Sequence, residues 1–289
     1  MSEDKLEVRF WGVRGSIPVP GPDTVGVGGN TSCVEVCGGG SRLVLDAGTG
    51  LRGLGNALLA KGEHQNVTVV LSHVHWDHVM GLPFFTPIYM PGVRLTVASG
   101  PAGRQPLREI LRRQMSAPMF PVDLCDVGAK VVCRELSEGQ TFSVGALEVE
   151  TARLNHPDPV YAFRVSYGGR SVVYATDTEH YACIDPRLER LARGADLLIY
   201  DAQYTPEEYA GVAGPSRMGW GHSTYAAGAE LARAAGVDTL ALFHHDPGRG
   251  DAQVDAIVER ARALFPRTIA AREGLSVAFG GAGAARDAA

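Results

Sequence analysis

Short runs of apolar and β-branched residues recur along the whole chain. They are rich in Val, Leu and Tyr and are bounded by Gly, Pro, Asp or Ser, which is typical of β-strands rather than helices. Ten such runs predict strands, at residues 6–11, 33–36, 42–46, 67–72, 93–98, 147–154, 162–166, 171–177, 197–201 and 239–244. The pattern therefore indicates a scaffold dominated by strands.

Longer stretches, in which apolar residues recur every three or four positions, predict helices between these strands. They cover residues 51–61, 105–114, 185–193, 224–235 and 254–265. Gly62 follows the first helix, and Ser223 is a suitable N-cap for the fourth. Because strands and helices occur in both halves of the chain, two stacked sheets with outer helices are expected. No linker composition interrupts the pattern, so residues 1–279 are predicted to form one domain and residues 280–289 a disordered tail.

Composition and charge narrow the possible partners. The chain has 289 residues, of which 45% are hydrophobic, and its net charge of -5 comes from 27 basic and 32 acidic residues. No basic run resembles a nucleic-acid arm, so a large nucleic acid is not an expected partner. No apolar stretch approaches the ~18–20 residues of a membrane span, and no secretory signal is evident, which predicts a cytoplasmic protein without membrane contact. Five cysteines at irregular spacings argue against a disulfide framework.

Metal-binding side chains are concentrated directly behind the strand predicted at residues 67–72. His73, His75, Asp77 and His78 lie within six residues. Alternate side chains of extended backbone share a face, so His73 and His75 can serve one metal ion, and Asp77 and His78 a second. Imidazole nitrogens and carboxylate oxygens suit zinc, with manganese or iron as alternatives.

Further metal-binding residues lie at the ends of other predicted strands. His156 follows the strand at 147–154, and Asp177 closes the strand at 171–177, where its carboxylate can bridge two cations. The strand at 239–244 delivers His244 and His245, of which only one is expected to be a ligand. His244 is the predicted ligand because it shares a strand face with the apolar residues before it. His245 is then an alternative ligand, or a residue that supports the site or faces the substrate.

The segment 73–78, HVHWDH, matches the HxHxDH signature and resembles the metallo-β-lactamase superfamily. The segment 45–48, LDAG, is similar to the aspartate-containing strand end that precedes this signature in the family. The resemblance implies an α+β fold, an αββα sandwich of two mixed β-sheets flanked by helices, with a two-metal site at one edge. Asp46 would then hold a ligand imidazole through its other nitrogen. Asp201 can do the same, or it can cap its own loop.

Two further segments resemble the phosphodiesterase branch of that superfamily, which includes RNase Z and PhnP-type cyclic phosphodiesterases. They are GNTS at 29–32 and GHST at 221–224. The resemblance implies that Asp77 and His222 are catalytic, with His222 as the proton donor to the leaving oxygen rather than a metal ligand. The alternative is that His222 only precedes a helix N-cap. Arg14 and Arg217 can clamp a phosphate, or they can be ordinary surface arginines.

These features favour a hydrolase that cleaves a small phosphodiester with a hydroxide bridging two divalent metal ions. A cyclic nucleotide, a cyclic ribose phosphate or a short oligonucleotide is the expected substrate. RNase Z has a long arm between its counterparts of His156 and Asp177, which here are only 21 residues apart, so a whole tRNA is not expected. Hydrolysis of a lactone, thioester or β-lactam is the first alternative, and a non-catalytic metal- or nucleotide-binding module is the second. The resemblance also suggests a homodimer.

Overall fold

Two seven-stranded sheets form the centre of the computed structural model, which describes residues 5–103, 105–212 and 214–280. The first sheet has the order β14 (Ser276–Gly280), β1 (Lys5–Gly12), β2 (Cys33–Gly38), β3 (Ser41–Leu45), β4 (Asn66–Leu71), β5 (Arg94–Ser99) and β6 (Lys130–Glu135). The second has the order β13 (Thr268–Ala270), β12 (Thr239–Phe243), β11 (Leu197–Asp201), β10 (Arg170–Ala175), β9 (Val160–Tyr167), β8 (Leu147–Leu154) and β7 (Thr141–Val144). Each sheet is mixed, because parallel pairs start at β3 in the first sheet and at β10 in the second.

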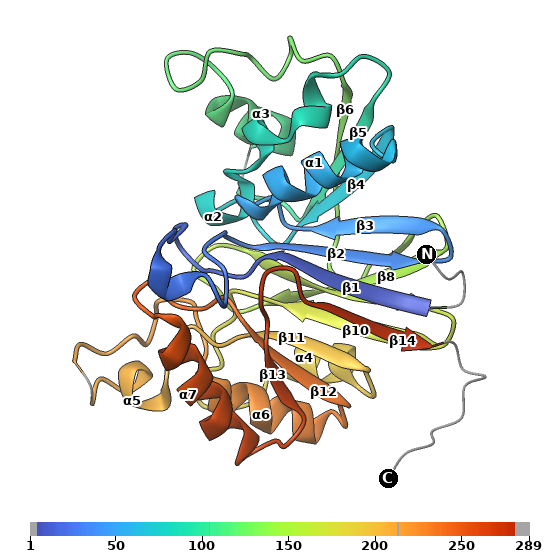
Figure 1. Ribbon diagram of the computed structural model, residues 1–289. Coiled ribbons are helices and arrows are strands. Elements are labelled where there is room, and N and C mark those ends of the chain that lie inside the picture. The colour runs from blue at the N-terminus through green and yellow to red at the C-terminus, as the bar shows by residue number, and fades with distance from the viewer. Residues whose placement is uncertain (1–4, 104, 213, 281–289) are drawn as a thin grey trace.

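Helices cover the outer face of each sheet (Figure 1). The first sheet carries α1 (Gly50–Lys61) and α3 (Leu107–Gln114), with the one-turn α2 (Trp76–Val79) at one edge. The second carries α4 (Pro186–Ala192), α6 (Tyr225–Ala234) and α7 (Asp251–Arg262), while the short α5 (Pro206–Tyr209) lies at the same edge as α2. The predicted αββα sandwich is therefore confirmed. In the described part of the chain, no helix is long and apolar enough to cross a membrane.

The alternation of side chains along the strands explains why two faces of each sheet are covered. In β1, Leu6, Val8 and Phe10 are buried in the core between the sheets, whereas the residues between them face the other side. In β3, Leu45 joins this inner core, and Val44 packs in the outer core beneath α1. Complete burial of one such side chain stabilises the fold by roughly 1.5–3 kcal/mol.

All ten predicted strands and all five predicted helices are present, with boundaries shifted by a few residues. The four strands that the pattern did not predict are β6, β7, β13 and β14, the edge strands of the two sheets. An edge strand has one neighbour and is less completely buried, so it needs no continuous apolar run; β7, for example, alternates exposed and half-buried residues. The one-turn helices α2 and α5 were also not predicted, because one turn carries no periodicity.

The predicted strand ends need a correction. Asp46, Asp177 and His244 were expected to be the last residues of strands, but β3, β10 and β12 each end before them. These three residues have φ values of 63°, 50° and 58°, in the left-handed region. A non-glycine residue in this region costs free energy and turns the chain sharply. Each of the three therefore leaves its strand at the edge where the functional side chains lie.

The end of the described chain also differs from expectation. Gly280, predicted to begin the tail, is the last residue of β14 and pairs with Lys5 of β1. The remaining predicted tail, 281–289, lies outside the described residues. The loop at 116–125 packs against the outer core, in which Leu124 is buried and against which the partly buried Phe120 lies. The single domain at 1–279 stays a prediction.

Two glycines of α1 provide a test of this packing. A Cβ atom on the buried Gly55 would lie 2.8 Å from Cδ2 of Phe85, whereas one on the exposed Gly53 would come no closer than 3.4 Å to Trp11. Gly55→Ala is expected to lower the free energy of unfolding by about 1–3 kcal/mol through overpacking. Gly53→Ala is expected to raise it by about 0.4–1 kcal/mol, because the unfolded chain loses entropy. Urea unfolding measures both, and similar effects at the two positions would contradict this packing.

Candidate metal centre

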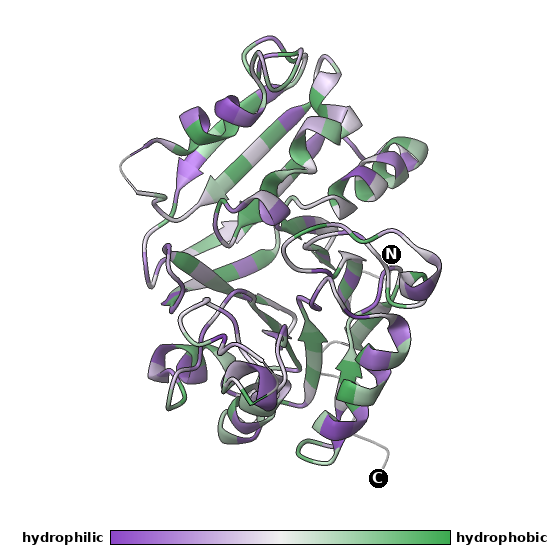
Figure 2. Cartoon of the chain, turned by 90° about the vertical axis from the view of Figure 1, so that its left-hand side faces the viewer, coloured by the Kyte–Doolittle hydropathy of each residue, from purple (hydrophilic) through white to green (hydrophobic). Residues whose placement is uncertain are grey.

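The carboxyl ends of several strands meet at one edge of the sandwich. The strands β3 and β4 are parallel neighbours in the first sheet, as are β10, β11 and β12 in the second. Parallel neighbours end on the same side, so the residues that follow them gather there. This edge carries α2 on the left of Figure 1 and faces the viewer in Figure 2, where the strands are largely hydrophobic up to the loops that surround it.

Three imidazoles form the first cluster at this edge. One nitrogen of each of His73, His75 and His156 lies within 4.8 Å of the others. Nδ1 of His75 is 3.3 Å from Nε2 of His156, and hydrogen bonds orient both rings from outside. Nε2 of His75 lies 3.0 Å from a carboxylate oxygen of Asp158, and Nδ1 of His156 donates to the carbonyl of Gly221 at 2.8 Å. The ring nitrogens turned toward each other are therefore free to accept a cation.

Two carboxylates and two imidazoles form the second cluster, and all four side chains are buried. Nε2 of His78 lies 3.2 Å from Oδ2 of Asp77 and 3.2 Å from Oδ1 of Asp177. Nε2 of His244 lies at the same distances from the same two oxygens. The other oxygen of Asp177 is 3.7 Å from Nε2 of His73, in the first cluster. Asp177 therefore lies between the two clusters and can be shared by them.

Buried hydrogen bonds hold the imidazoles of the second cluster. Oδ2 of Asp46 is 2.7 Å from Nδ1 of His78. Asp46 also accepts hydrogen bonds from the backbone and hydroxyl of Ser72 and from the hydroxyl of Tyr174. Oε1 of Gln203 is 2.9 Å from Nδ1 of His244. Since each ring donates through Nδ1, its Nε2 keeps a lone pair directed into the cluster.

The donor atoms fit a pair of divalent cations. In the described part of the chain, Nε2 of His73 and Nε2 of His78 are buried and have no hydrogen-bond partner. Buried polar atoms are seldom left without a partner, and a metal ion would satisfy both. Burial raises the pKa of Asp177, but the positive charge that the imidazoles of His244 and His78 carry when they are protonated outweighs burial and holds this pKa well below the ordinary carboxyl value. Asp177 is thus anionic at neutral pH, as a ligand carboxylate must be.

His222 lies beside both clusters. Its ring stacks on that of His244 at a centroid distance of 5.0 Å and meets that of His156 edge-on at 5.5 Å. Its Nδ1 is 2.9 Å from Oδ2 of Asp201. Burial lowers the pKa of His222, but the Asp201 carboxylate outweighs burial and raises this pKa to about 9. Nε2 has no hydrogen bond to any described residue, so it is free to act on a substrate.

Asp201 combines the two roles considered for it. One oxygen accepts from the backbone of Gln203 at 3.0 Å, which caps the loop after β11. The other holds His222 at 2.9 Å.

Two expectations are corrected by the geometry. His245 belongs to neither cluster, because its Nε2 lies 3.0 Å from the carbonyl oxygen of Ala271, and burial lowers its pKa to about 3. It therefore helps to fix the end of β12 rather than to bind metal or phosphate. Arg14 is neither a surface residue nor a phosphate clamp. It is fully buried and donates to the carbonyl oxygens of Gly28 at 2.8 Å and Arg249 at 2.7 Å, which anchors the long loop after β1.

Several supporting residues were not predicted from the sequence. Gln203 and Asp158 each lie two residues beyond a predicted site residue, which is the only local signal that could have identified them. Glu179, two residues beyond Asp177, carries the same signal. Its buried carboxylate accepts hydrogen bonds from the backbone nitrogens of Gly219 and Gly221, which fixes the segment that holds His156.

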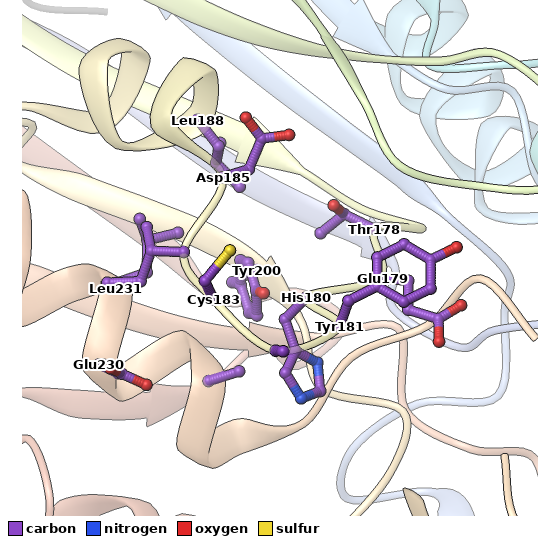
Figure 3. A pocket seen from close by; sticks show the side chains of 13 residues that line it. Thr178, Glu179, His180, Tyr181, Cys183, Asp185, Leu188, Tyr200, Glu230 and Leu231 are labelled. Carbon is purple, nitrogen blue, oxygen red and sulfur yellow. The ribbon is translucent and has the colours of Figure 1, made fainter. Parts of the chain in front are cut away.

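A separate cavity of about 90 Å³ lies beside the segment that follows Asp177 (Figure 3). Its lining includes the carboxylates of Glu179, Asp185 and Glu230, and none of the residues of the two clusters. Because these carboxylates repel anions, the cavity does not suit a phosphate. An anionic substrate is therefore expected to bind and react at the metal edge, the edge of the sandwich that carries the two clusters.

Comparisons with known proteins agree with this geometry. The family model described as "Beta-lactamase superfamily domain" matches residues 41–245. Ribonuclease Z of Methanopyrus kandleri is 29% identical over 297 aligned positions, which cover 94% of this chain and 98% of that protein. Among solved structures, the metallo-beta-lactamase fold protein YhfI of Bacillus subtilis has a TM-score of 0.72 at 20% identity, with 96% of this chain and 100% of that chain covered. A diphosphatase of the PhnP family has a TM-score of 0.66 at 18% identity, with 95% and 97% covered. The chain therefore belongs to the metallo-β-lactamase superfamily.

Proposed function

We propose that this chain is a metal-dependent hydrolase of phosphodiester bonds, and that it acts on small diesters. The observation that carries the proposal is the pair of adjacent clusters that share Asp177, in which two buried imidazole nitrogens make no hydrogen bond to any described residue. A non-catalytic binding module has no need of His222, whose free Nε2 lies beside both clusters.

The first ion would be held by His73, His75 and His156, the second by Asp77, His78 and His244, and Asp177 would bind both. When bound, two divalent ions lower the pKa of a water molecule and neutralise charge on the oxygens of the diester. Five imidazoles and two carboxylates favour zinc over magnesium or calcium, which prefer oxygen ligands. Zinc is therefore the proposed metal, with manganese or iron as alternatives.

The remaining residues orient these groups and move protons. Asp46 and Gln203 fix the imidazoles of the second cluster, which keeps each Nε2 directed at the site. Asp77 accepts a hydrogen bond from the backbone of Ser16 at 2.8 Å and is proposed as an acceptor for the proton of the attacking water. His222, held by Asp201, is proposed to donate a proton from Nε2 to the leaving oxygen.

The size of the substrate is inferred from the interval between His156 and Asp177. The antiparallel hairpin of β9 and β10 fills this interval, so it has no room for a long arm. However, several relatives are named Ribonuclease Z, which weakens the expectation that no large nucleic acid is a substrate. We therefore infer a small diester or short oligonucleotide and include a precursor tRNA among the substrates to be tested.

Removal of metal is the first test. The protein purified with zinc or with manganese is expected to hydrolyse bis(p-nitrophenyl) phosphate, to lose this activity on treatment with a chelator and to regain it when metal returns. A lactone, a β-lactam and a precursor tRNA are assayed beside it. Two bound metals without diester hydrolysis would overturn the proposal, and turnover of the lactone or β-lactam would then support the first alternative.

Asp46 and Asp158 provide a matched pair of carboxylates that each contact a ligand imidazole. Asp46 is fully buried and the side chain of Asp158 is 71% exposed. Asp46→Asn is expected to lower metal affinity about 10–100-fold, because such supporting residues contribute that much and the amide cannot accept all of the surrounding donors. Asp158→Asn is expected to lower it less than about 3-fold, since an exposed pair contributes little. Competition with a chromophoric chelator measures both, with unfolding of the metal-free proteins as the control. Equal affinities would contradict the proposed role of Asp46.

His222→Ala tests the proton donor. It is expected to lower kcat about 10²–10⁴-fold for a diester with an alkyl alcohol as leaving group, because an alkoxide needs a proton to depart. The loss is expected to be smaller with bis(p-nitrophenyl) phosphate, whose leaving group is stable as an anion. Metal content is expected to stay unchanged, and His64→Ala, outside both clusters, is the control. An equal loss for the two leaving groups would show that His222 does not act as the acid.

A further inference from the structure

The segment between α5 and α6 carries an arginine and a tryptophan at the metal edge. Cζ of Arg217 lies over the ring of Trp220, 4.3 Å from its centroid, and 5.9 Å from that of Tyr204. Trp220 is 53% exposed. In the part of the chain that the structure describes, the guanidinium of Arg217 makes no hydrogen bond or ion pair, so all its N–H groups are free to donate.

This arginine–tryptophan pair adjoins the residues proposed for catalysis. The ring of Tyr204 meets that of His222 edge-on at a centroid distance of 5.8 Å. Gly221 directly follows Trp220, and its carbonyl accepts the hydrogen bond from Nδ1 of His156. Gly221 has φ 87°, and a Cβ atom there would lie 2.2 Å from Nδ1 of His156. Trp220 is therefore the neighbour in the chain of Gly221, which orients the proposed metal ligand His156.

Buried hydrogen bonds keep the pair in place. The carboxylate of Glu179 accepts from the backbone nitrogens of Gly219 at 2.7 Å and Gly221 at 2.9 Å, the two neighbours of Trp220 in the chain. The backbone of Arg217 donates to the carbonyl of Tyr209, whose hydroxyl donates to the same Glu179. An exposed aromatic ring held on a fixed backbone is preorganised for a ligand, because little further ordering is needed on binding.

The two side chains suit two different parts of one nucleotide. An exposed indole offers a face on which any nucleobase can stack. A guanidinium with free donors binds a phosphate through two parallel hydrogen bonds. We propose that Arg217 and Trp220 form a nucleotide subsite, in which the base next to the scissile phosphate stacks on Trp220 and a second phosphate binds Arg217. This inference rests on the proposed function and narrows its substrate class to short oligonucleotides.

Three substrates that share the p-nitrophenolate leaving group separate the contribution of the base from that of the second phosphate. Methyl p-nitrophenyl phosphate has neither a base nor a second phosphate. Thymidine 5′-(p-nitrophenyl phosphate) adds the base, and its 3′-phosphorylated form adds the second phosphate. Wild-type KM is expected to fall along this series. Because the same bond is broken each time, differences in KM report the subsite rather than the chemistry.

Trp220→Ala is expected to raise KM about 5–100-fold for both thymidine substrates, with kcat changed less than about 3-fold, and to leave the methyl substrate unaffected. Trp220→Phe keeps a ring and is expected to restore most of the loss. Arg217→Gln is expected to raise KM only for the 3′-phosphorylated substrate, and Arg217→Lys to restore part of it, since lysine keeps the charge without the paired donors. Arg52→Gln, an exposed arginine on α1, is the matched control.

A binding measurement gives a readout that does not need turnover. Thymidine 3′,5′-bisphosphate is expected to quench the tryptophan fluorescence of the wild-type protein, with or without metal, and not that of Trp220→Phe. If the wild type hydrolyses all three substrates with equal KM and the bisphosphate causes no quenching, the subsite is overturned while the proposed function stands. If none of the three is hydrolysed with both metals bound, the proposed function fails, and quenching alone would then support a nucleotide site.

Discussion

The buried carboxylate of Asp46 is the interaction on which the edge of this molecule depends. It directly follows β3 of the first sheet and accepts a hydrogen bond from Tyr174, in β10 of the second sheet, at 2.7 Å. It also accepts from Ser72 at the end of β4 and from Nδ1 of His78. A buried charge without partners would cost several kcal/mol, so its burial is tolerated only because these donors surround it. The same hydrogen bonds join the two sheets to each other and attach the second cluster to both sheets.

The position of the site follows from how strands end. Asp46 and His244 directly follow parallel strands, Asp177 lies two residues beyond one, and all three have left-handed backbone conformations. This conformation turns the chain within two residues of the end of each strand, so the side chains are held next to the sheets rather than on free loops. Because Asp177 and His244 follow strands of one sheet and His73 and His78 follow a strand of the other, the packing of the two sheets sets the distances between these metal-binding side chains. The core that stabilises the fold is therefore also what positions the metal-binding atoms.

The loops around the two clusters are also held by hydrogen bonds to buried residues. Arg14 anchors the long loop after β1, whose Ser16 donates to Asp77. Glu179 fixes both neighbours of Trp220 and, through Gly221, the orientation of His156. The loops around the metal edge are thus connected to buried charged groups, although they lack regular secondary structure. Such supports keep a polar, solvent-facing site from losing its geometry when no ligand is present.

The sequence by itself determined the central strands, the long helices and the first four metal-binding residues, because all of these depend on local spacing. The period of apolar residues is set by the backbone, and the spacing of His73, His75, Asp77 and His78 needs no distant contact. Only the tertiary structure decided the rest. The edge strands were missed because partial exposure removes the apolar pattern. The orientation of His244 rather than His245 toward the cluster depends on one backbone angle and on Gln203 and Ala271. Arg14 is buried, and Arg217 lies over Trp220, because segments distant in the sequence fold around them, which no local pattern encodes.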